Sequence, residues 1–178
     1  MKTGVIISGF GGQGVMLAGT LLCNAGILEE KNVTFFPSYG AEMRGGTANC
    51  QVIVSDQPIG SPAVSRPNIL ICLNYPSWDR FSGKVAENGI IIANSSLVSP
   101  ENPGGKTGFI PANNIAEECG SVLAANTVLL GAMSQICRTV SLDSIKKSIP
   151  NLMSGKKDKL IELNIRAAEE GYKAAERQ

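Results

Sequence analysis

Short apolar runs rich in β-branched residues alternate along this chain with longer segments in which apolar residues recur at helical spacing. Because nearly every position in the short runs is apolar, we expect strands that are buried on both faces of a mostly parallel sheet. The alternation predicts an α/β fold: a single three-layer α/β/α domain over residues 1–178, with a Rossmann-like first strand–helix unit. The expected strands cover residues 4–8, 33–36, 49–55, 69–73, 89–93 and 108–111.

The same periodicity, together with residues that favour helix ends, predicts the helices. Asn126 is interpreted as the N-cap of a helix whose apolar residues lie on every side, which predicts deep burial. Ser141 is interpreted as the N-cap of the next one. The expected helices cover about residues 13–28, 76–81, 126–137, 141–150 and 158 onward. The apolar side of the last helix is expected to hold Ile161, Ile165, Ala168 and Tyr172.

Composition and charge exclude several classes of function. The chain has 178 residues, with 16 Lys and Arg against 15 Asp and Glu, and we find no basic cluster that would bind nucleic acid. Histidine is absent, which removes the imidazole base, the Ser–His and Cys–His nucleophiles and the usual zinc and haem ligand. Five scattered cysteines without a C-x-x-C pair indicate reduced, mostly buried thiols. We therefore expect no catalytic residue, no metal site and no iron–sulfur cluster on this chain.

The long uncharged segment from Thr3 to Leu28 does not predict a membrane span. Glycines, Gln13 and Asn24 interrupt it well before the roughly 20 apolar residues that a span requires. A buried strand followed by a buried helix explains the segment better, and we expect a cytoplasmic protein.

A glycine-rich turn lies between the first expected strand and the first expected helix. Gly9, Gly11 and Gly14 match the pattern G-x-G-x-x-G, and Gly12 and Gln13 complete the turn. Glycines let backbone N–H groups approach an anion closely, and the helix that follows offers its positive end. Tight packing of strand against helix is an equally simple reason for the same glycines. Both interpretations stay open from the residues alone.

The dinucleotide fingerprint around this turn is incomplete. A dinucleotide site would also have an acidic residue at the end of the second strand, where it holds the ribose. Here the second expected strand ends at Phe36-Pro37-Ser38. A site for NAD is therefore only an alternative.

A second unusual segment, Tyr39–Cys50, comes immediately before and into the third expected strand. In it Glu42 and Arg44 precede Gly45 and Gly46. Residues two apart in an extended segment share a face, and an arginine beside glycines suits bidentate capture of a carboxylate or phosphate. A local Glu–Arg ion pair that stabilises a turn explains the two charges equally well.

Four segments together resemble the gamma subunit of 2-oxoacid:ferredoxin oxidoreductases. They are Gly9–Val15, Tyr39–Cys50, Ser55-Asp56 with Pro58–Pro62, and Asn126–Gly131, in the family's order and across essentially the whole chain. The run Glu-Met-Arg-Gly-Gly from Glu42 is the specific part, because the glycine turn alone is common. Matched to the family's motifs, the glycine turn, Glu42, Arg44, Gly45, Gly46 and Asn126 become candidate cofactor-binding residues.

The resemblance implies a subunit of a larger enzyme with alpha, beta and delta-type subunits. Such complexes oxidise a 2-oxoacid with coenzyme A and ferredoxin, giving acyl-CoA, CO2 and reduced ferredoxin. Thiamine diphosphate and the iron–sulfur clusters then lie on the partner subunits, while this chain packs against them and contributes to the coenzyme A site. The isolated chain is expected to be inactive and able to form homo-oligomers through the surface meant for its partners. Thr47-Ala48-Asn49 is closer to the 2-oxoglutarate synthase or branched-chain type than to the pyruvate type.

Two alternatives to this function remain at the level of the sequence. One is a stand-alone nucleotide-binding oxidoreductase that uses the turn from Gly9 to Gly14. The other is a purely structural assembly domain whose turn binds nothing. Titration of the chain with nicotinamide dinucleotides and with coenzyme A separates all three.

Overall fold

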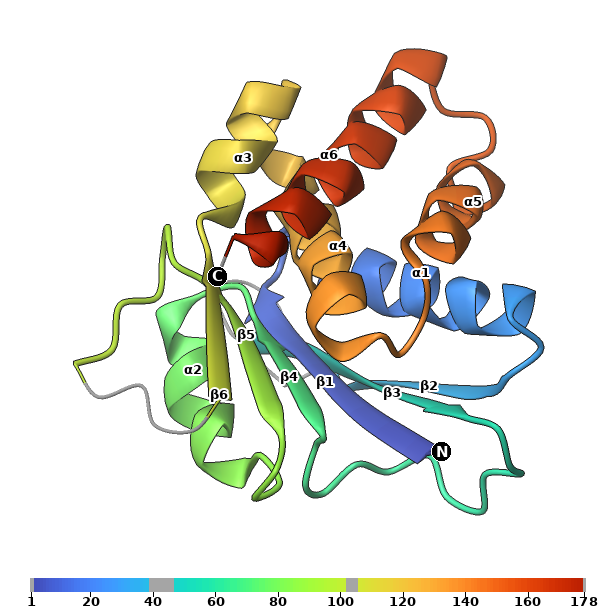
Figure 1. Ribbon diagram of the computed structural model, residues 1–178, viewed down its shortest axis with the longest axis vertical. Helices are drawn as coiled ribbons and strands as arrows, with labels where there is room; N and C mark the ends of the chain where they lie inside the picture. Colours follow the sequence, from blue (N-terminus) through green and yellow to red (C-terminus); the bar gives the residue numbers. More distant parts are fainter. Residues whose placement is uncertain (1, 39–46, 102–105, 178) are drawn as a thin grey trace.

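The computed structural model describes residues 2–38, 47–101 and 106–177 (Figure 1). Every expected strand is present, with bounds that differ by a few residues from those predicted. The strands are β1 (Lys2–Phe10), β2 (Asn32–Ser38), β3 (Thr47–Ser55), β4 (Ile69–Cys72), β5 (Ile90–Asn94) and β6 (Lys106–Ile110). The helices are α1 (Val15–Leu28), α2 (Tyr75–Phe81), α3 (Ala112–Cys119), α4 (Ala125–Cys137), α5 (Leu142–Leu152) and α6 (Asp158–Glu176), with short 3-10 helices η1 (Ser82–Lys84) and η2 (Val122–Ala124).

The strands form a single mixed sheet in the order β2-β3-β1-β4-β5-β6. β1, β4, β5 and β6 pair in parallel, whereas β3 runs antiparallel to both of its neighbours, β1 and β2. β3 is thus the strand that departs from the expected parallel arrangement. It also separates β2 from β1, so the first β-α-β unit encloses a strand that comes later in the chain. The expected α/β class is confirmed.

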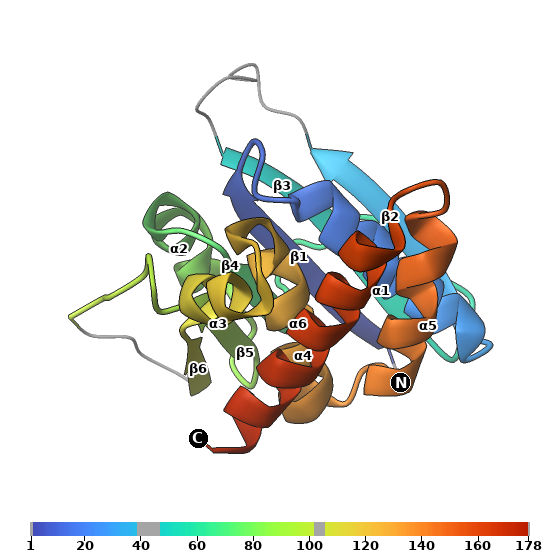
Figure 2. The ribbon, with the colours of Figure 1, turned by 90° about the horizontal axis from the view of Figure 1, so that it is seen from above.

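Alternation along the strands divides the core between the two faces of the sheet. Ile7 of β1 and Ile71 of β4 belong to the core cluster shared with α1, α3, α4, α5 and α6, while Ile6 and Leu70 belong to the cluster that includes Trp78 and Phe81 of α2. Figure 2 shows α2 on one side of the strands and the main helical layer on the other. The expected three layers are therefore unequal: among the described residues, α2 is the one α-helix on the second face, where η1 and the segments around Val64 and Val98 complete the cover.

α4 is buried from Ala125 to Ser134 because it lies between the sheet and α6 (Figures 1 and 2). The two helices approach so closely that only glycine fits at two of their contacts. A Cβ on Gly131 would overlap the backbone of Ala168, and a Cβ on Gly171 would overlap the backbone of Val128. The apolar residues on every side of α4 thus predicted its burial correctly.

Three sequence predictions about helices need correction. α3 was not expected, because its segment Ala-Asn-Asn-Ile-Ala-Glu-Glu-Cys is only 8 residues long and contains two asparagines, which disfavour helix. The buried side of α6 is centred on small residues and Asn164, whereas Ile161, Ile165 and Tyr172 are only partly buried at its flanks. α5 continues two residues past Pro150, to Leu152. Ser141 does cap α5, since its hydroxyl accepts a hydrogen bond from the Ser144 N–H at 3.1 Å.

Within the described residues, no helix has the length and apolar character that a passage through a bilayer demands.

Candidate functional site

The candidate site lies at the edge of the sheet where the parallel strands β1, β4 and β5 have their carboxyl ends. In open α/β sheets this edge is where ligands bind. The glycine turn follows β1, Asn74 follows β4, and Asn94 ends β5. The loops that leave these strands therefore bring their polar residues to one place.

Gln13 closes the glycine turn and ties it to the neighbouring loop. Its backbone N–H donates to the Phe10 carbonyl oxygen at 3.1 Å. Its side-chain oxygen Oε1 accepts from the Phe10 N–H at 2.7 Å and from Asn74 Nδ2 at 2.8 Å. Asn74 is itself fixed, because its Oδ1 accepts from the Ser77 N–H at 3.0 Å and so caps α2. One side chain thus holds the turn and joins it to the end of β4.

The glycines of the turn are required for two different reasons. Gly12 and Gly14 have φ angles of +93° and +74°, a region that side chains other than glycine rarely adopt. Gly9 is required by packing, because a Cβ there would lie 2.8 Å from Gln13 Oε1 and 3.0 Å from Leu73 Cβ. Gly11 is exposed. Close packing thus accounts for Gly9, while the backbone conformation accounts for Gly12 and Gly14.

Asn126 lies inside α4 and does not cap it, contrary to the sequence prediction. α4 begins at Ala125 after the short helix η2, so Asn126 is in its first turn. The side chain is 1% exposed, and its Nδ2 donates to the Gly14 carbonyl oxygen at 3.0 Å. Asn126 therefore connects the glycine turn to the buried helix, a role that its position in the sequence did not reveal.

A buried hydrogen-bond chain continues from Asn126 to α6. The Thr127 hydroxyl lies 3.4 Å from Asn126 Oδ1 and donates to Asn164 Oδ1 at 2.9 Å. Asn164 Nδ2 in turn donates to the Leu160 carbonyl oxygen at 2.9 Å. Thr127 and Asn164 are buried, so these bonds are shielded from water and hold the turn in a fixed position relative to α4 and α6.

Sequence reasoning missed three asparagines at this edge: Asn74, Asn94 and Asn113. Asn94 is fully buried; its Nδ2 donates to the Leu73 carbonyl oxygen at 3.2 Å and to Asn113 Oδ1 at 2.9 Å. Its Oδ1 accepts from the Ala112 N–H at 3.1 Å, which joins β5 to the start of α3. Asn74 and Asn94 each directly follow an apolar run predicted to be a strand. A polar residue in that position could have been recognised as a candidate for the carboxyl edge of the sheet.

A cavity of about 180 Å³ opens beside the glycine turn. Its walls are mostly apolar, and two of its wall residues, Val122 and Leu123, are 40% and 71% exposed. Gln13 and Asn113 supply its side-chain amides. The described residues that line it are Gly12, Gln13, Leu73, Asn113, Val122, Leu123 and Ala125.

The second sequence motif falls largely outside the described residues. Glu42, Arg44, Gly45 and Gly46 all belong to the segment that the structure leaves undescribed. The described ends of that segment are close to the turn in the sheet, since Thr47 pairs with Phe10 and Ser38 pairs with Asn49.

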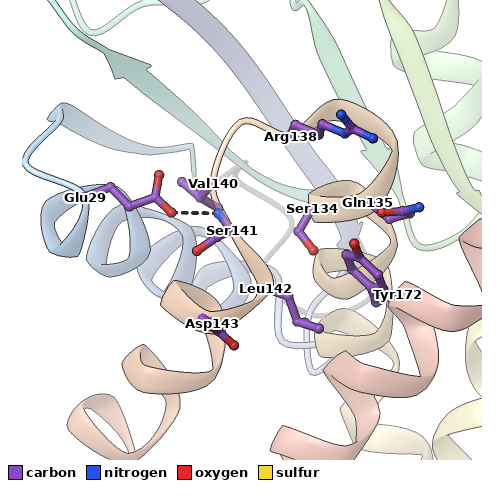
Figure 3. A pocket seen from close by; sticks show the side chains of 9 residues that line it. All are labelled: Glu29, Ser134, Gln135, Arg138, Val140, Ser141, Leu142, Asp143 and Tyr172. Carbon is purple, nitrogen blue, oxygen red and sulfur yellow. Dashed lines mark hydrogen bonds between the residues drawn. The ribbon is translucent and has the colours of Figure 1, made fainter.

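A larger cavity of about 780 Å³ lies between the ends of α1 and α4 and the start of α5 (Figure 3). At its wall the Ser141 N–H donates to Glu29 Oε1 at 2.6 Å, and Glu29 pairs with Lys31 at 2.9 Å. Partial burial raises the pKa of Glu29, but these contacts and those of nearby serine hydroxyls outweigh it and lower the pKa to about 2. This network fastens the end of α1 to the α4–α5 link, which gives Glu29 a structural role.

The cysteine thiols are poor nucleophiles. All five are free, and four of them are buried. Burial raises the pKa of Cys23 to about 11 and the pKa values of Cys50, Cys72 and Cys137 to about 12, and it also raises the pKa of Cys119. Among the residues that the structure describes, no three His, Cys, Asp or Glu side chains come together as metal ligands would.

Comparison with known proteins identifies the family. The model of the family "Pyruvate ferredoxin/flavodoxin oxidoreductase" matches residues 4–174. The ketoisovalerate oxidoreductase subunit VorA of Methanothermobacter thermautotrophicus is 40% identical over 168 residues, which are 94% of this chain and 35% of VorA. The chain therefore spans about a third of the length of that curated relative.

Two solved structures share the fold. One is the gamma subunit of a keto/oxoacid ferredoxin oxidoreductase from Geobacter sulfurreducens, with a TM-score of 0.87, 30% identity and coverage of 99% of this chain and 98% of that one. The other is a 2-oxoglutarate:ferredoxin oxidoreductase from Magnetococcus marinus with 2-oxoglutarate, coenzyme A and succinyl-CoA bound. Its TM-score is 0.89 at 22% identity, with coverage of 99% of this chain and 31% of that one. The resemblance seen in the sequence is confirmed: the chain belongs to the pyruvate ferredoxin/flavodoxin oxidoreductase family.

Proposed function

We propose that this chain, as one gamma-type domain over residues 1–178, is the gamma subunit of a 2-oxoacid:ferredoxin oxidoreductase. The complex oxidises a 2-oxoacid with coenzyme A and oxidised ferredoxin to acyl-CoA, CO2 and reduced ferredoxin. Its family supports this proposal, as does a likeness to a separate gamma subunit that covers nearly all of both chains. Thr47-Ala48-Asn49 favours 2-oxoglutarate or a branched-chain 2-oxoacid as the substrate.

In this proposal the chain holds coenzyme A and docks on its partners, which carry out the chemistry. Thiamine diphosphate and the iron–sulfur clusters belong to alpha, beta and delta-type partners, and the assembly works in the cytoplasm. The residues of this chain fit such a division of work. Histidine is absent, which removes the imidazole base, and burial holds the thiols of Cys50 and Cys72 protonated.

One observation carries the coenzyme A role: a closed glycine turn at the carboxyl edge of the sheet, beside a cavity with amide groups. In this role Gly11, Gly12, Gln13 and Gly14 face the phosphates of coenzyme A, while Gly9 and Asn126 keep the turn in place. Glu42, Arg44, Gly45 and Gly46 complete the site, with Arg44 as the cation for a phosphate or carboxylate. We include these four residues because the described ends of their segment pair with strands close to the turn.

The strand order argues against the dehydrogenase alternative. In a dinucleotide-binding fold the second strand lies beside the first, and an acidic residue at its end holds the ribose. Here β3 lies between β1 and β2, and β2 ends in Phe36-Pro37-Ser38. The end of β2, which would hold the ribose, therefore has no acidic residue and does not lie beside β1.

Purification of the tagged chain from its own cells tests the proposed function. The expected preparation contains thiamine-binding and ferredoxin-like polypeptides, identified by mass spectrometry, and reduces ferredoxin only when a 2-oxoacid and coenzyme A are both present. The chain expressed alone should show no turnover. Full thiamine-dependent turnover by the lone chain would overturn the proposal, as would a native preparation of the chain without partners.

A further inference from the structure

β2 is the outermost strand on one side of the sheet, and its free edge carries no charge (Figure 1). Among the described strands only β3 pairs with it. Its sequence, Asn-Val-Thr-Phe-Phe-Pro-Ser, has no charged residue, although charged side chains are a usual means of keeping an exposed edge from pairing with another chain. β6, the outermost strand on the other side, begins instead at the exposed Lys106. Of these two strands, β2 is therefore the less protected against a further strand.

The hydrogen bonds of the sheet show which backbone groups of β2 point outward. The Ser8 carbonyl oxygen accepts from the Leu73 N–H at 2.9 Å, so Ser8 and every second residue of β1 point to β4, and the residues between them point to β3. The antiparallel registers of β1 with β3 and of β3 with β2 carry this alternation across the sheet. The backbone groups of Val33, Phe35 and Pro37 are therefore directed away from β3. Proline suits such a position, because it has no N–H to pair.

The helix beside this edge presents an uncharged surface as well. α1 packs against β2, and no residue of α1 is charged. At its end Ile27 and Leu28 are 59% and 46% exposed. The half-buried Thr20 and Asn24 each donate a hydrogen bond to a carbonyl oxygen of the helix itself. The solvent side of a surface helix normally carries charged residues, so their absence here indicates a surface that another protein covers.

A second copy of the chain fits the free edge of β2. A two-fold axis beside Thr34 places Val33 of each copy opposite Phe35 of the other, and residues placed in this way exchange both of their N–H···O bonds. Every outward N–H group of β2 is then paired. On the side of α1, Val33 and Phe35 meet as a β-branched and an aromatic side chain, which is a favourable cross-strand pair. Pro37 lies beyond this stretch, so its missing N–H does not interrupt the pairing.

We infer that two copies of this chain form a dimer through β2 and the neighbouring solvent side of α1. A strand of 7 residues is about 24 Å long and the sheet with its helix layer is about 20 Å thick, so each copy contributes roughly 500 Å². The two copies together reach the roughly 1,000 Å² that a specific interface needs, which is typical of a weak dimer. Because the surface is uncharged, it does not repel a copy of itself and has no charge pattern that would select a different partner. The inference is independent of the proposed function.

Sedimentation equilibrium of the full chain from about 1 to 200 μM tests the dimer, which should dissociate in the micromolar range of weak complexes. Phe36→Lys should weaken it about tenfold or more, because a 46% exposed ring at the edge loses its apolar contact and a lysine there opposes pairing. Leu97→Lys makes the same change in charge at a 44% exposed residue after β5, and it should stay within about twofold of the parent, because a distant exposed charge is screened. A parent chain that is monomeric throughout this range would overturn the inference. Equal dimerisation of the two variants would do so too.

A disulfide across the proposed axis tests the register. Thr34 lies opposite its own copy in a non-hydrogen-bonded pair, where Cα atoms are about 4.5 Å apart, a separation that a disulfide spans. Thr34→Cys, oxidised with diamide, should therefore run as a covalent dimer on a non-reducing gel and return to monomer with a reducing agent. Asn32→Cys is the matched control on the same strand, because the two copies of Asn32 are about 14 Å apart along the strands. The parent controls for the native thiols, which are all free.

The crosslink decides the question by itself if Phe36→Lys does not fold, which circular dichroism reveals. Crosslinking of Thr34→Cys no stronger than that of Asn32→Cys would overturn the pairing of β2 with its own copy. A chain that stays monomeric yet is purified from its cells with thiamine-binding polypeptides would overturn the dimer and leave the proposed function standing.

Discussion

Single side chains hold the glycine turn in place, and Asn126 is the clearest case. Its Nδ2 donates to the Gly14 carbonyl oxygen from a fully enclosed position. Asn126→Ala should lower the free energy of unfolding by about 1–3 kcal/mol, since the bond is lost in a buried site. Urea unfolding measures this, with Asn88→Ala at an exposed turn residue as the control. A loss in Asn126→Ala no larger than in the control would contradict the role of Asn126.

Gly14 and Gly12 share a positive φ but differ in their surroundings, so they should respond differently to alanine. A Cβ on Gly14 would lie 2.5 Å from Asn126 Nδ2, whereas a Cβ on Gly12 would meet nothing within 4 Å. Gly12→Ala should lower the free energy of unfolding by about 1–2 kcal/mol, because alanine is strained in a left-handed backbone conformation. Gly14→Ala should lower the free energy of unfolding by clearly more than Gly12→Ala does, and thermal unfolding measures the difference. Combining it with Asn126→Ala should recover part of the loss, and strictly additive losses would refute the contact.

Glu29 predicts a specific dependence of stability on pH. Its contacts lower the pKa in the folded protein to about 2, below that of an ordinary glutamate. The stabilisation is therefore fully present above the unfolded pKa of about 4.3 and is lost as the pH falls toward 2. Glu29→Gln should unfold at lower urea concentration than the parent at pH 7, and the difference should shrink between about pH 4.5 and pH 2. A difference that stays constant across this range would contradict the role of Glu29.

Residue-scale chemistry was only partly visible in the sequence. The glycine pattern identified the turn, because positive φ angles and close packing both call for glycine. The bond from Asn126 to Gly14 spans 112 positions in the sequence, so no local pattern could reveal it, and a helix-capping residue was the natural misreading. Asn113 and Asn94 acquire their roles from neighbours on different strands and helices, which only the fold brings together.

At the scale of elements, α4 and α6 approach each other so closely that glycine is required where they meet. Gly171→Ala should lower the free energy of unfolding by about 1–3 kcal/mol or more, because a Cβ would overlap the backbone of Val128. The result is opposite to the usual gain when alanine replaces glycine in a helix. Gly83→Ala in η1 is the control, since its Cβ would meet nothing within 4 Å. Thermal unfolding should separate the two; a Gly171→Ala variant as stable as the parent would show that the helices are not so close.

The elements themselves were largely predictable, and their order in the sheet was not. Continuous apolar runs located β1, β4 and β5, because burial on both faces removes polar positions from them. The outermost strands β2 and β6 are not buried on both faces as the sequence predicted, since most of their residues are exposed or half-buried. The antiparallel place of β3 between β1 and β2 depends on how its residues pair over a long distance, as Phe10 does with Thr47. The inner face of α6 was only partly predicted: Ala168 is fully buried, but close helix packing also selects small residues there, and Ile161 and Ile165 pack against the core from its flanks.

At the scale of the whole molecule, the fold separates its two ends. The carboxyl edge of the sheet gathers the glycine turn, the amide cluster and the smaller cavity, while the opposite end carries the Glu29 network and the larger cavity. The family and the fold class could be read from the sequence, because motifs in the right order identify both. The amide cluster at the site could not, because its members are held together by contacts between β1, β4, β5 and α3.

The proposed function has this chain hold coenzyme A while its partners carry out the chemistry. Calorimetric titration of the full isolated chain with coenzyme A tests it most directly. A parallel titration with NADH tests the alternative, a nucleotide-binding oxidoreductase. The proposal predicts saturable binding of coenzyme A at one site per chain and no heat of binding with NADH. Binding of NADH in preference to coenzyme A, or no binding of coenzyme A at any concentration up to the millimolar range of weak ligands, would contradict it.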